Sequence, residues 1–166
     1  MQFNKEIYIE DKLISSMSPT FIIAEAGVNH GGNMEIAKQL IDLAADAKAD
    51  AVKFQTFKTE HLILSDIQKA PYQKDTTDAS ESQYDMLKRL EVSREQNLDL
   101  KQYCMDKGIV FLTTPFDEES LEEIDDLDLP AYKVSSTDTT NLPFLKKIAK
   151  KGKPIFLSTG MSYLSE

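Results

Sequence analysis

The sequence is short of cysteine, tryptophan, histidine and positive charge, and each shortage removes a class of explanation. Among 166 residues there are one cysteine, no tryptophan and two histidines. The single thiol, Cys104, excludes an intrachain disulfide, and its place in a helical pattern favours a buried structural role over a nucleophilic one. Lysine and arginine total 19 against 28 aspartates and glutamates, which gives a net charge of −9. Such an acidic chain is a poor general partner for nucleic acid or for an anionic membrane.

Long apolar runs are also missing. The N-terminus lacks the apolar core of a signal peptide, and no stretch approaches the roughly 20 apolar residues that a membrane-spanning helix needs. These absences predict a cytoplasmic protein without a membrane partner. Hydrophobic residues nevertheless make up 41% of the chain, which is enough for the core of one globular domain.

The pattern of apolar residues divides the chain into two parts. Residues 3–14 read as two short strands joined at Glu10–Asp11, which predicts an N-terminal β-hairpin cap over residues 1–20. Over residues 21–166, apolar strands alternate with helices, and this order predicts an α/β fold with a parallel sheet and right-handed crossovers. Five strands are expected, at 21–26, 51–57, 109–114, 131–136 and 155–159. The helices between them are expected to begin at Asn33, at a capping box of Ser93 and Gln96, at Asp117, and at Asn141 or Thr140.

The longest interruption of this alternation is the stretch 58–92. It holds Pro71 and a polar, turn-rich run over 72–82, followed by a short helix expected at 83–90. Long loops in compact domains tend to be functional, so the stretch is a candidate lid, with a solvated insertion as the alternative.

Polar residues recur at one place in each unit, near the C-terminal end of the strand. They are Glu25, Lys53 and Gln55, Thr113 and Thr114, Lys133 with Ser135 and Ser136, and Ser158 with Thr159. Parallel strands bring these ends to one face, where (β/α)8 barrels build their active sites. An open doubly wound sheet is the alternative, but it usually carries a glycine-rich phosphate turn that is absent here. We therefore predict a TIM-barrel-type fold with about its first five βα units present, as the N-terminal part of something larger.

Two lysines at these strand ends predict an anionic ligand. Lys53 and Lys133 would repel each other and lose hydration unless an anion neutralised them. In the alternative interpretation both side chains extend from the strand ends into solvent and bind nothing. The recurrence of polar strand ends over five strands favours the site.

Five motifs carry a resemblance to a known family. They are E-A-G-V-N-H-G-G (25–32), V-K-F-Q-T-F (52–57), F-L-T-T-P-F-D (111–117), Y-K-V-S-S-T-D-T-T-N-L-P (132–143) and G-K-P-I-F-L-S-T-G-M (152–161). In this order and spacing they resemble the sialic acid synthase family, which includes legionaminic and pseudaminic acid synthases. The resemblance implies a (β/α)-barrel enzyme that condenses phosphoenolpyruvate with an N-acetylmannosamine-type sugar. The products would be phosphate and a nine-carbon α-keto acid, and a divalent metal, manganese or magnesium, would assist.

The resemblance also implies roles for individual residues. Those matching catalytic positions are Glu25, Lys53 and Lys133, and those matching substrate-binding positions are Gln55, Thr114, Phe116, Ser136, Asp138 and Ser158. At 137–138 this chain has Thr-Asp where the family usually has Gly-Glu, so the carboxylate that meets the sugar is one methylene shorter.

The metal ligands of the family are not expected in this chain. The family's two metal-binding histidines lie on later strands, and neither His30 nor His61 is assigned to metal. The C-terminal antifreeze-like domain of the family is also expected to be absent, and the full-length form is expected to be a homodimer. Two other hypotheses stay open: a related phosphoenolpyruvate-dependent synthase acting on a phosphorylated sugar, and a non-catalytic binding half-barrel or assembly partner.

Overall fold

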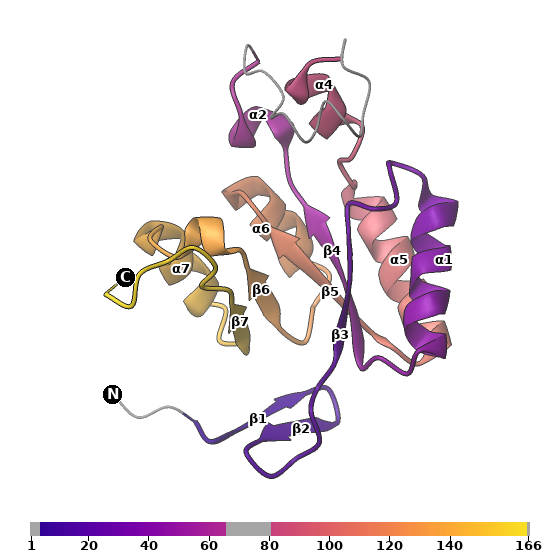
Figure 1. Cartoon of the computed structure of the whole chain (residues 1–166), viewed down its shortest axis with the longest axis vertical. Helices are drawn as coiled ribbons and strands as arrows, with labels where there is room; N and C mark the ends of the chain where they lie inside the picture. Colours follow the sequence, from indigo (N-terminus) through magenta and orange to yellow (C-terminus); the bar gives the residue numbers. More distant parts are fainter. Residues whose placement is uncertain (1–3, 66–80, 166) are drawn as a thin grey trace.

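The computed structural model of the chain describes residues 4–65 and 81–165. It begins with an antiparallel hairpin of β1 (Glu6–Ile9) and β2 (Lys12–Ser15), which turns at the expected Glu10–Asp11. Figure 1 shows this hairpin at the end of the molecule where the parallel strands begin. Ile9 is fully buried in a small apolar cluster with Ala51, Val110, Leu112 and Ala131, so the hairpin plugs the N-terminal end of the strands.

Five parallel strands follow the hairpin, and the α/β fold with parallel pairing is confirmed. They are β3 (Ile23–Gly27), β4 (Ala51–Thr56), β5 (Val110–Pro115), β6 (Tyr132–Val134) and β7 (Ile155–Leu157). The hydrogen-bonded pairing is divided into two parts. Strands β3, β4 and β5 form one hydrogen-bonded sheet, β6 pairs with β7, and β6 lies next to β5 without a ladder between them.

Helices cover the outer face of the strands, as Figure 1 shows. They are α1 (Met34–Asp46), α5 (Arg94–Lys107), α6 (Glu118–Asp125) and α7 (Leu142–Ala149). Each begins where the sequence predicts, because a short polar side chain at the N-cap accepts hydrogen bonds from the first free N–H groups of the helix. These caps are Asn33, Ser93 with Gln96 in a full capping box, Asp117, and Asn141 in preference to Thr140.

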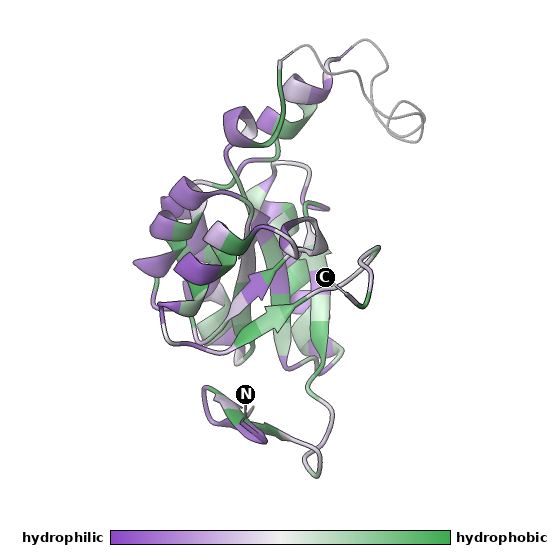
Figure 2. Cartoon of the chain, turned by 90° about the vertical axis from the view of Figure 1, so that its left-hand side faces the viewer, coloured by the Kyte–Doolittle hydropathy of each residue, from purple (hydrophilic) through white to green (hydrophobic). Residues whose placement is uncertain are grey.

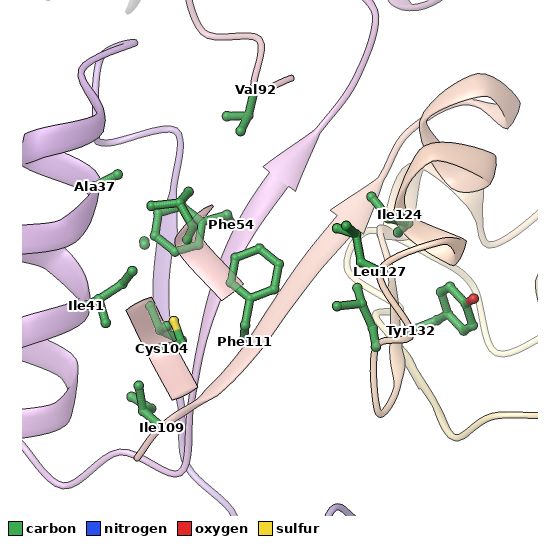
Figure 3. Packing of buried hydrophobic residues seen from close by; sticks show 14 of the residues in the cluster. Ala37, Ile41, Phe54, Val92, Cys104, Ile109, Phe111, Ile124, Leu127 and Tyr132 are labelled. Atoms are coloured by element: carbon green, nitrogen blue, oxygen red, sulfur yellow. The ribbon is translucent and has the colours of Figure 1, made fainter. Parts of the chain in front are cut away.

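Between strands and helices lies the main apolar core. In Figure 3 the rings of Phe54 from β4 and Phe111 from β5 face Ile41 of α1 and Cys104 of α5. The two rings stack with centroids 5.9 Å apart. Cys104 is fully buried, as expected for a structural thiol, and this burial raises its pKa to about 12. The outward faces of the helices are hydrophilic, as Figure 2 shows.

The stretch after β4 leaves the layer of strands at their C-terminal end. Its described parts are α2 (Thr59–Leu62) and α4 (Gln83–Lys88), which lie above the strands in Figure 1. Residues 66–80, the middle of the candidate lid, lie outside the described residues.

The fourth strand ends earlier than expected. It was predicted to reach Ser136, but β6 stops at Val134 and a 3-10 turn, η1 (Ser136–Asp138), follows. The cause is local, because the Ser135 hydroxyl accepts a hydrogen bond from the N–H of Thr137 and so competes with extended pairing.

Among the helices in residues 4–65 and 81–165, none is long and apolar enough to cross a membrane.

Candidate active site

The polar strand ends converge on one open hollow of about 280 Å³. Its walls are Glu25, Lys53, Gln55, Thr114, Phe116, Lys133, Ser135, Ser136 and Ser158. Eight of the nine side chains predicted for the site therefore lie together, although they come from five different strands or strand ends. Ser135 lines the hollow without having been assigned to it. Strand alternation gave the signal, since Ser135 follows Lys133 by two positions and shares its face.

Lys53 is held by an ion pair at the centre of the hollow. Its side chain is 8% exposed, and its Nζ lies 2.8 Å from Oε2 and 2.9 Å from Oε1 of Glu25. It also donates to Oγ1 of Thr114 at 3.3 Å. The pair follows from the parallel register, in which Glu25 of β3 lies directly beside Lys53 of β4. The half-exposed carboxylate thus neutralises one of the two lysines.

Lys133 has no carboxylate partner among the ion pairs of the described residues. Its Nζ donates to Oγ of Ser158 at 2.6 Å and to the backbone carbonyl of Val134 at 2.7 Å. Burial lowers the pKa of Lys133, repulsion from Lys53 lowers it further, and attraction to Glu25 opposes both. The hollow therefore holds two cations and one anion, and the uncompensated charge is on Lys133.

Gly27 allows this arrangement through its backbone. Its φ of +54° suits glycine, and the strand register shifts between Glu25 and Gly27. A Cβ at this position would lie 2.9 Å from Oε1 of Glu25 and 3.5 Å from Nε2 of Gln55. The absence of a side chain leaves room for the carboxylate that pairs with Lys53.

Asp138 is the one predicted site residue that does not line this hollow. It is buried in η1, and its Oδ1 accepts from Nδ2 of Asn141 at 3.0 Å. Its neighbour Ser136 lines the hollow because the 3-10 turn returns the chain toward the strand ends. The carboxylate of Asp138 thus orients the side chain of Asn141 and does not face the hollow.

The two histidines have different environments. His30 is fully buried, its Nδ1 accepts from the N–H of Gly32 at 3.0 Å, and burial lowers its pKa. His61 is partly exposed, with Nδ1 3.4 Å from Oδ1 of Asp117. Within residues 4–65 and 81–165 no group of three His, Cys, Asp or Glu side chains could hold a metal ion. The residues described here do not by themselves fit a metal site.

Comparison with known proteins identifies relatives that are named as synthases of sugar acids. The NeuB family model matches residues 40–166. The N,N'-diacetyllegionaminic acid synthase of Campylobacter jejuni is 49% identical over 150 residues, which are 90% of this chain and 45% of that protein. The enzyme of the same name from Legionella pneumophila is 45% identical over 152 residues, covering 92% of this chain and 42% of that protein.

A solved structure supports the same relationship. The N-acetylneuraminic acid (sialic acid) synthetase of Leptospira borgpetersenii matches with a TM-score of 0.83 at 34% identity, over 96% of this chain and 51% of that one. The chain thus spans less than half the length of the two curated relatives and about half of the solved chain. The resemblance to sialic acid synthases that five motifs indicated is confirmed, and the chain belongs to the NeuB family.

Proposed function

We propose that this chain supplies the phosphoenolpyruvate-binding part of a synthase active site. The synthase would condense phosphoenolpyruvate with an N-acetylmannosamine-type sugar, giving phosphate and a nine-carbon, sialic-acid-like α-keto acid. The observation that carries the proposal is the hollow, in which Lys53 and Lys133 meet four hydroxyl side chains, those of Thr114, Ser135, Ser136 and Ser158. Charge-assisted hydrogen bonds from such a set suit a ligand that carries both a phosphate and a carboxylate.

The chain's own residues have definite tasks in this chemistry. Lys53 and Lys133 balance the charges of the phosphate and carboxylate while C3 of the enol bonds to the aldehyde carbon of the sugar. The aldehyde oxygen takes up a proton, water adds to the cation left at C2, and the C–O bond to phosphate then breaks. Glu25, at the edge of the hollow, can orient that water and accept its proton. The balanced reaction converts phosphoenolpyruvate, the sugar and water into the keto acid and phosphate.

The complete enzyme would extend beyond this chain. In the proposal the five strands belong to an eight-stranded barrel, and the later strands and the antifreeze-like domain complete a homodimeric full-length form. The divalent metal, manganese or magnesium, would take its ligands from outside the residues described here, which do not form a site for it.

A direct assay tests the proposed function. The chain is mixed with phosphoenolpyruvate, manganese and either N-acetylmannosamine or a phosphorylated pentose, while phosphate release and phosphoenolpyruvate binding are followed separately. Release with the N-acetylated sugar alone supports the proposal. Binding without release supports the binding part of the proposal and favours a non-catalytic binding half-barrel for this chain alone. A folded chain that does not bind phosphoenolpyruvate overturns the assignment of the two lysines.

Replacing Glu25 with glutamine is expected to separate binding from turnover. The variant keeps the side-chain shape but removes the one anion in the hollow, so Lys53 becomes fully available to the ligand. Phosphoenolpyruvate should bind about fivefold more tightly, the effect of removing one like-charge interaction at a partly exposed site. Phosphate release by the enzyme should fall, because the group that accepts the proton of water is gone. Calorimetry and the phosphate assay on the same sample check the two effects, and weaker binding would contradict the first.

Phosphoenolpyruvate binding should also weaken at alkaline pH. The ligand favours the charged form of Lys133, whose pKa in the free chain lies below the ordinary value for lysine. As the pH rises through that lowered pKa, the ammonium is lost and affinity falls, earlier than for an ordinary lysine. Binding titrations between about pH 7 and 10 measure the effect. A flat profile over this interval would show that Lys133 does not carry the charge that binds the ligand.

A further inference from the structure

One hydroxyl of the active-site hollow, that of Ser135, differs from the others in its hydrogen bonds. Its Oγ accepts from the N–H of Thr137 at 3.3 Å and from Oγ1 of Thr137 at 2.9 Å. A serine oxygen has two acceptor positions and one proton, so both acceptor positions of Ser135 are occupied. The hydroxyls of Thr114 and Ser158 each accept one bond from a lysine and keep a second acceptor position. Ser135 has its proton left to offer, and the hydrogen bonds of the described residues give that proton no acceptor.

The position of Ser135 determines where this proton can go. Ser135 lines the hollow and shares a face with Lys133, two positions before it, whereas Thr137 is exposed and lies outside the lining. The O–H bond of a hydroxyl points away from the bonds that its oxygen accepts, so the side toward the hollow is open to it. A hydroxyl that can donate but not accept favours an ionised oxygen, which only accepts, over a ligand group that must donate.

The 3-10 turn holds Ser135 in place before any ligand binds. Within η1 the carbonyl oxygen of Ser135 accepts from the N–H of Asp138 at 3.1 Å. The buried hydroxyl of Thr139 lies 3.0 Å from the carbonyl oxygen of Ser136 and 3.1 Å from that of Ser158, so it joins η1 to the segment after β7. A donor that is already fixed costs less conformational entropy on binding than one that the ligand must order.

Thr137 contributes two different groups to this arrangement. Any residue except proline would supply the N–H at this position, whereas the O–H requires threonine or serine. Without the O–H, one acceptor position of Ser135 is open, and its hydroxyl can rotate to accept as well as to donate. The exposed side chain of Thr137 therefore acts on the hollow through Ser135.

We propose that Ser135 is a further binding residue of the hollow, which donates to an ionised oxygen of the ligand, and that Thr137 is the positioning residue that keeps it a donor. The inference rests on the proposed function, in which this oxygen belongs to the phosphate or the carboxylate of phosphoenolpyruvate. Lys133 carries the uncompensated charge of the hollow, so an anionic group drawn to it meets the Ser135 proton on the same face.

A double-mutant cycle tests the two roles. The wild type, Ser135→Ala, Thr137→Val and the double variant are titrated calorimetrically with phosphoenolpyruvate and, separately, with inorganic phosphate. Ser135→Ala should weaken phosphoenolpyruvate binding about tenfold, the size of one hydrogen bond to a charged group. Thr137→Val, which keeps the N–H and the branched shape, should weaken it about threefold, the low end for one neutral hydrogen bond. The double variant should bind no more weakly than Ser135→Ala, because Thr137 acts through Ser135.

Two further variants separate the hydroxyl of Thr137 from a general effect on the turn. Thr137→Ser restores the hydroxyl and should bind as the wild type does. Thr140→Val is the matched control, since Thr140 is exposed, lies outside the lining and undergoes the same change three residues further on. It should leave binding unchanged. A loss in Ser135→Ala with none in Thr137→Val would make Ser135 only the cap of η1, because the capping N–H is kept, and would overturn the proposal. Additive losses, or no recovery in Thr137→Ser, would overturn the role of Thr137.

The two ligands distinguish this proposal from the proposed function. If the wild type and Ser135→Ala bind phosphoenolpyruvate equally well, the Ser135 donor is wrong and the proposed function stands. If the wild type binds inorganic phosphate but not phosphoenolpyruvate, and Ser135→Ala weakens that binding, the donor stands and the proposed function fails. If the folded wild type binds neither ligand, both fail.

Discussion

Replacing Lys133 with methionine should weaken phosphoenolpyruvate binding by about 100-fold. Loss of one partner from a buried, hydrogen-bonded charge pair costs about 2–5 kcal/mol, and 100-fold lies within that range. Replacing Lys133 should weaken binding more than replacing Lys53, because the charge of Lys53 is already shared with Glu25. Methionine keeps most of the aliphatic stem, so the packing beside Ser158 changes little. Calorimetric titration of the folded variant gives the affinity directly.

Lys146→Met is the control for this substitution. Lys146 lies exposed on α7 and does not line the hollow that contains Lys133. The two variants have the same net charge, so a general effect of the acidic chain on an anionic ligand would appear in both. We expect Lys146→Met to bind phosphoenolpyruvate as the wild type does. An equal loss in both variants would mean that the overall charge of the chain, and not the hollow, governs binding.

Much of this hollow could be predicted from the sequence because the relevant rules are local. Alternation along β4 separates Lys53 and Gln55 from Val52 and Phe54, and the structure buries the latter pair in the main core. Parallel strands then bring their C-terminal ends to one face without any knowledge of the loops. The N-caps were equally predictable, since each cap satisfies N–H groups within three residues of itself.

What could not be predicted depends on register and on loop conformation. The ion pair of Glu25 with Lys53 requires β3 and β4 to align at these residues, and the register shift before Gly27 leaves no clear pattern in the sequence. Asp138, which the family resemblance connects with the sugar, lies outside the hollow because the 3-10 turn places its carboxylate against the amide of Asn141.

The glycine-rich turn after β3 contacts the segment that contains α4, and Gly32 is the point of closest approach. The residue has a φ of +84°, and a Cβ built on it would lie 2.3 Å from the backbone carbonyl oxygen of Arg89, which follows α4. A backbone atom cannot rotate away as the end of a side chain can. An added methyl group must therefore push the turn and the end of α4 apart.

Gly32→Ala should consequently lower the free energy of unfolding by about 3 kcal/mol or more, combining the cost of a positive φ, roughly 1–2 kcal/mol, with that of overpacking, roughly 1–3 kcal/mol. Gly31→Ala is the matched control, because its φ of +59° is also positive but no atom lies within 4 Å of the added Cβ. It should cost only the backbone part, about 1 kcal/mol. Urea unfolding of the two variants measures the difference. Both variants carry the same methyl group in the same turn, so equal losses would show that the close approach of Gly32 to Arg89 contributes nothing. A larger loss at Gly32 would show that this contact holds the turn against the end of α4.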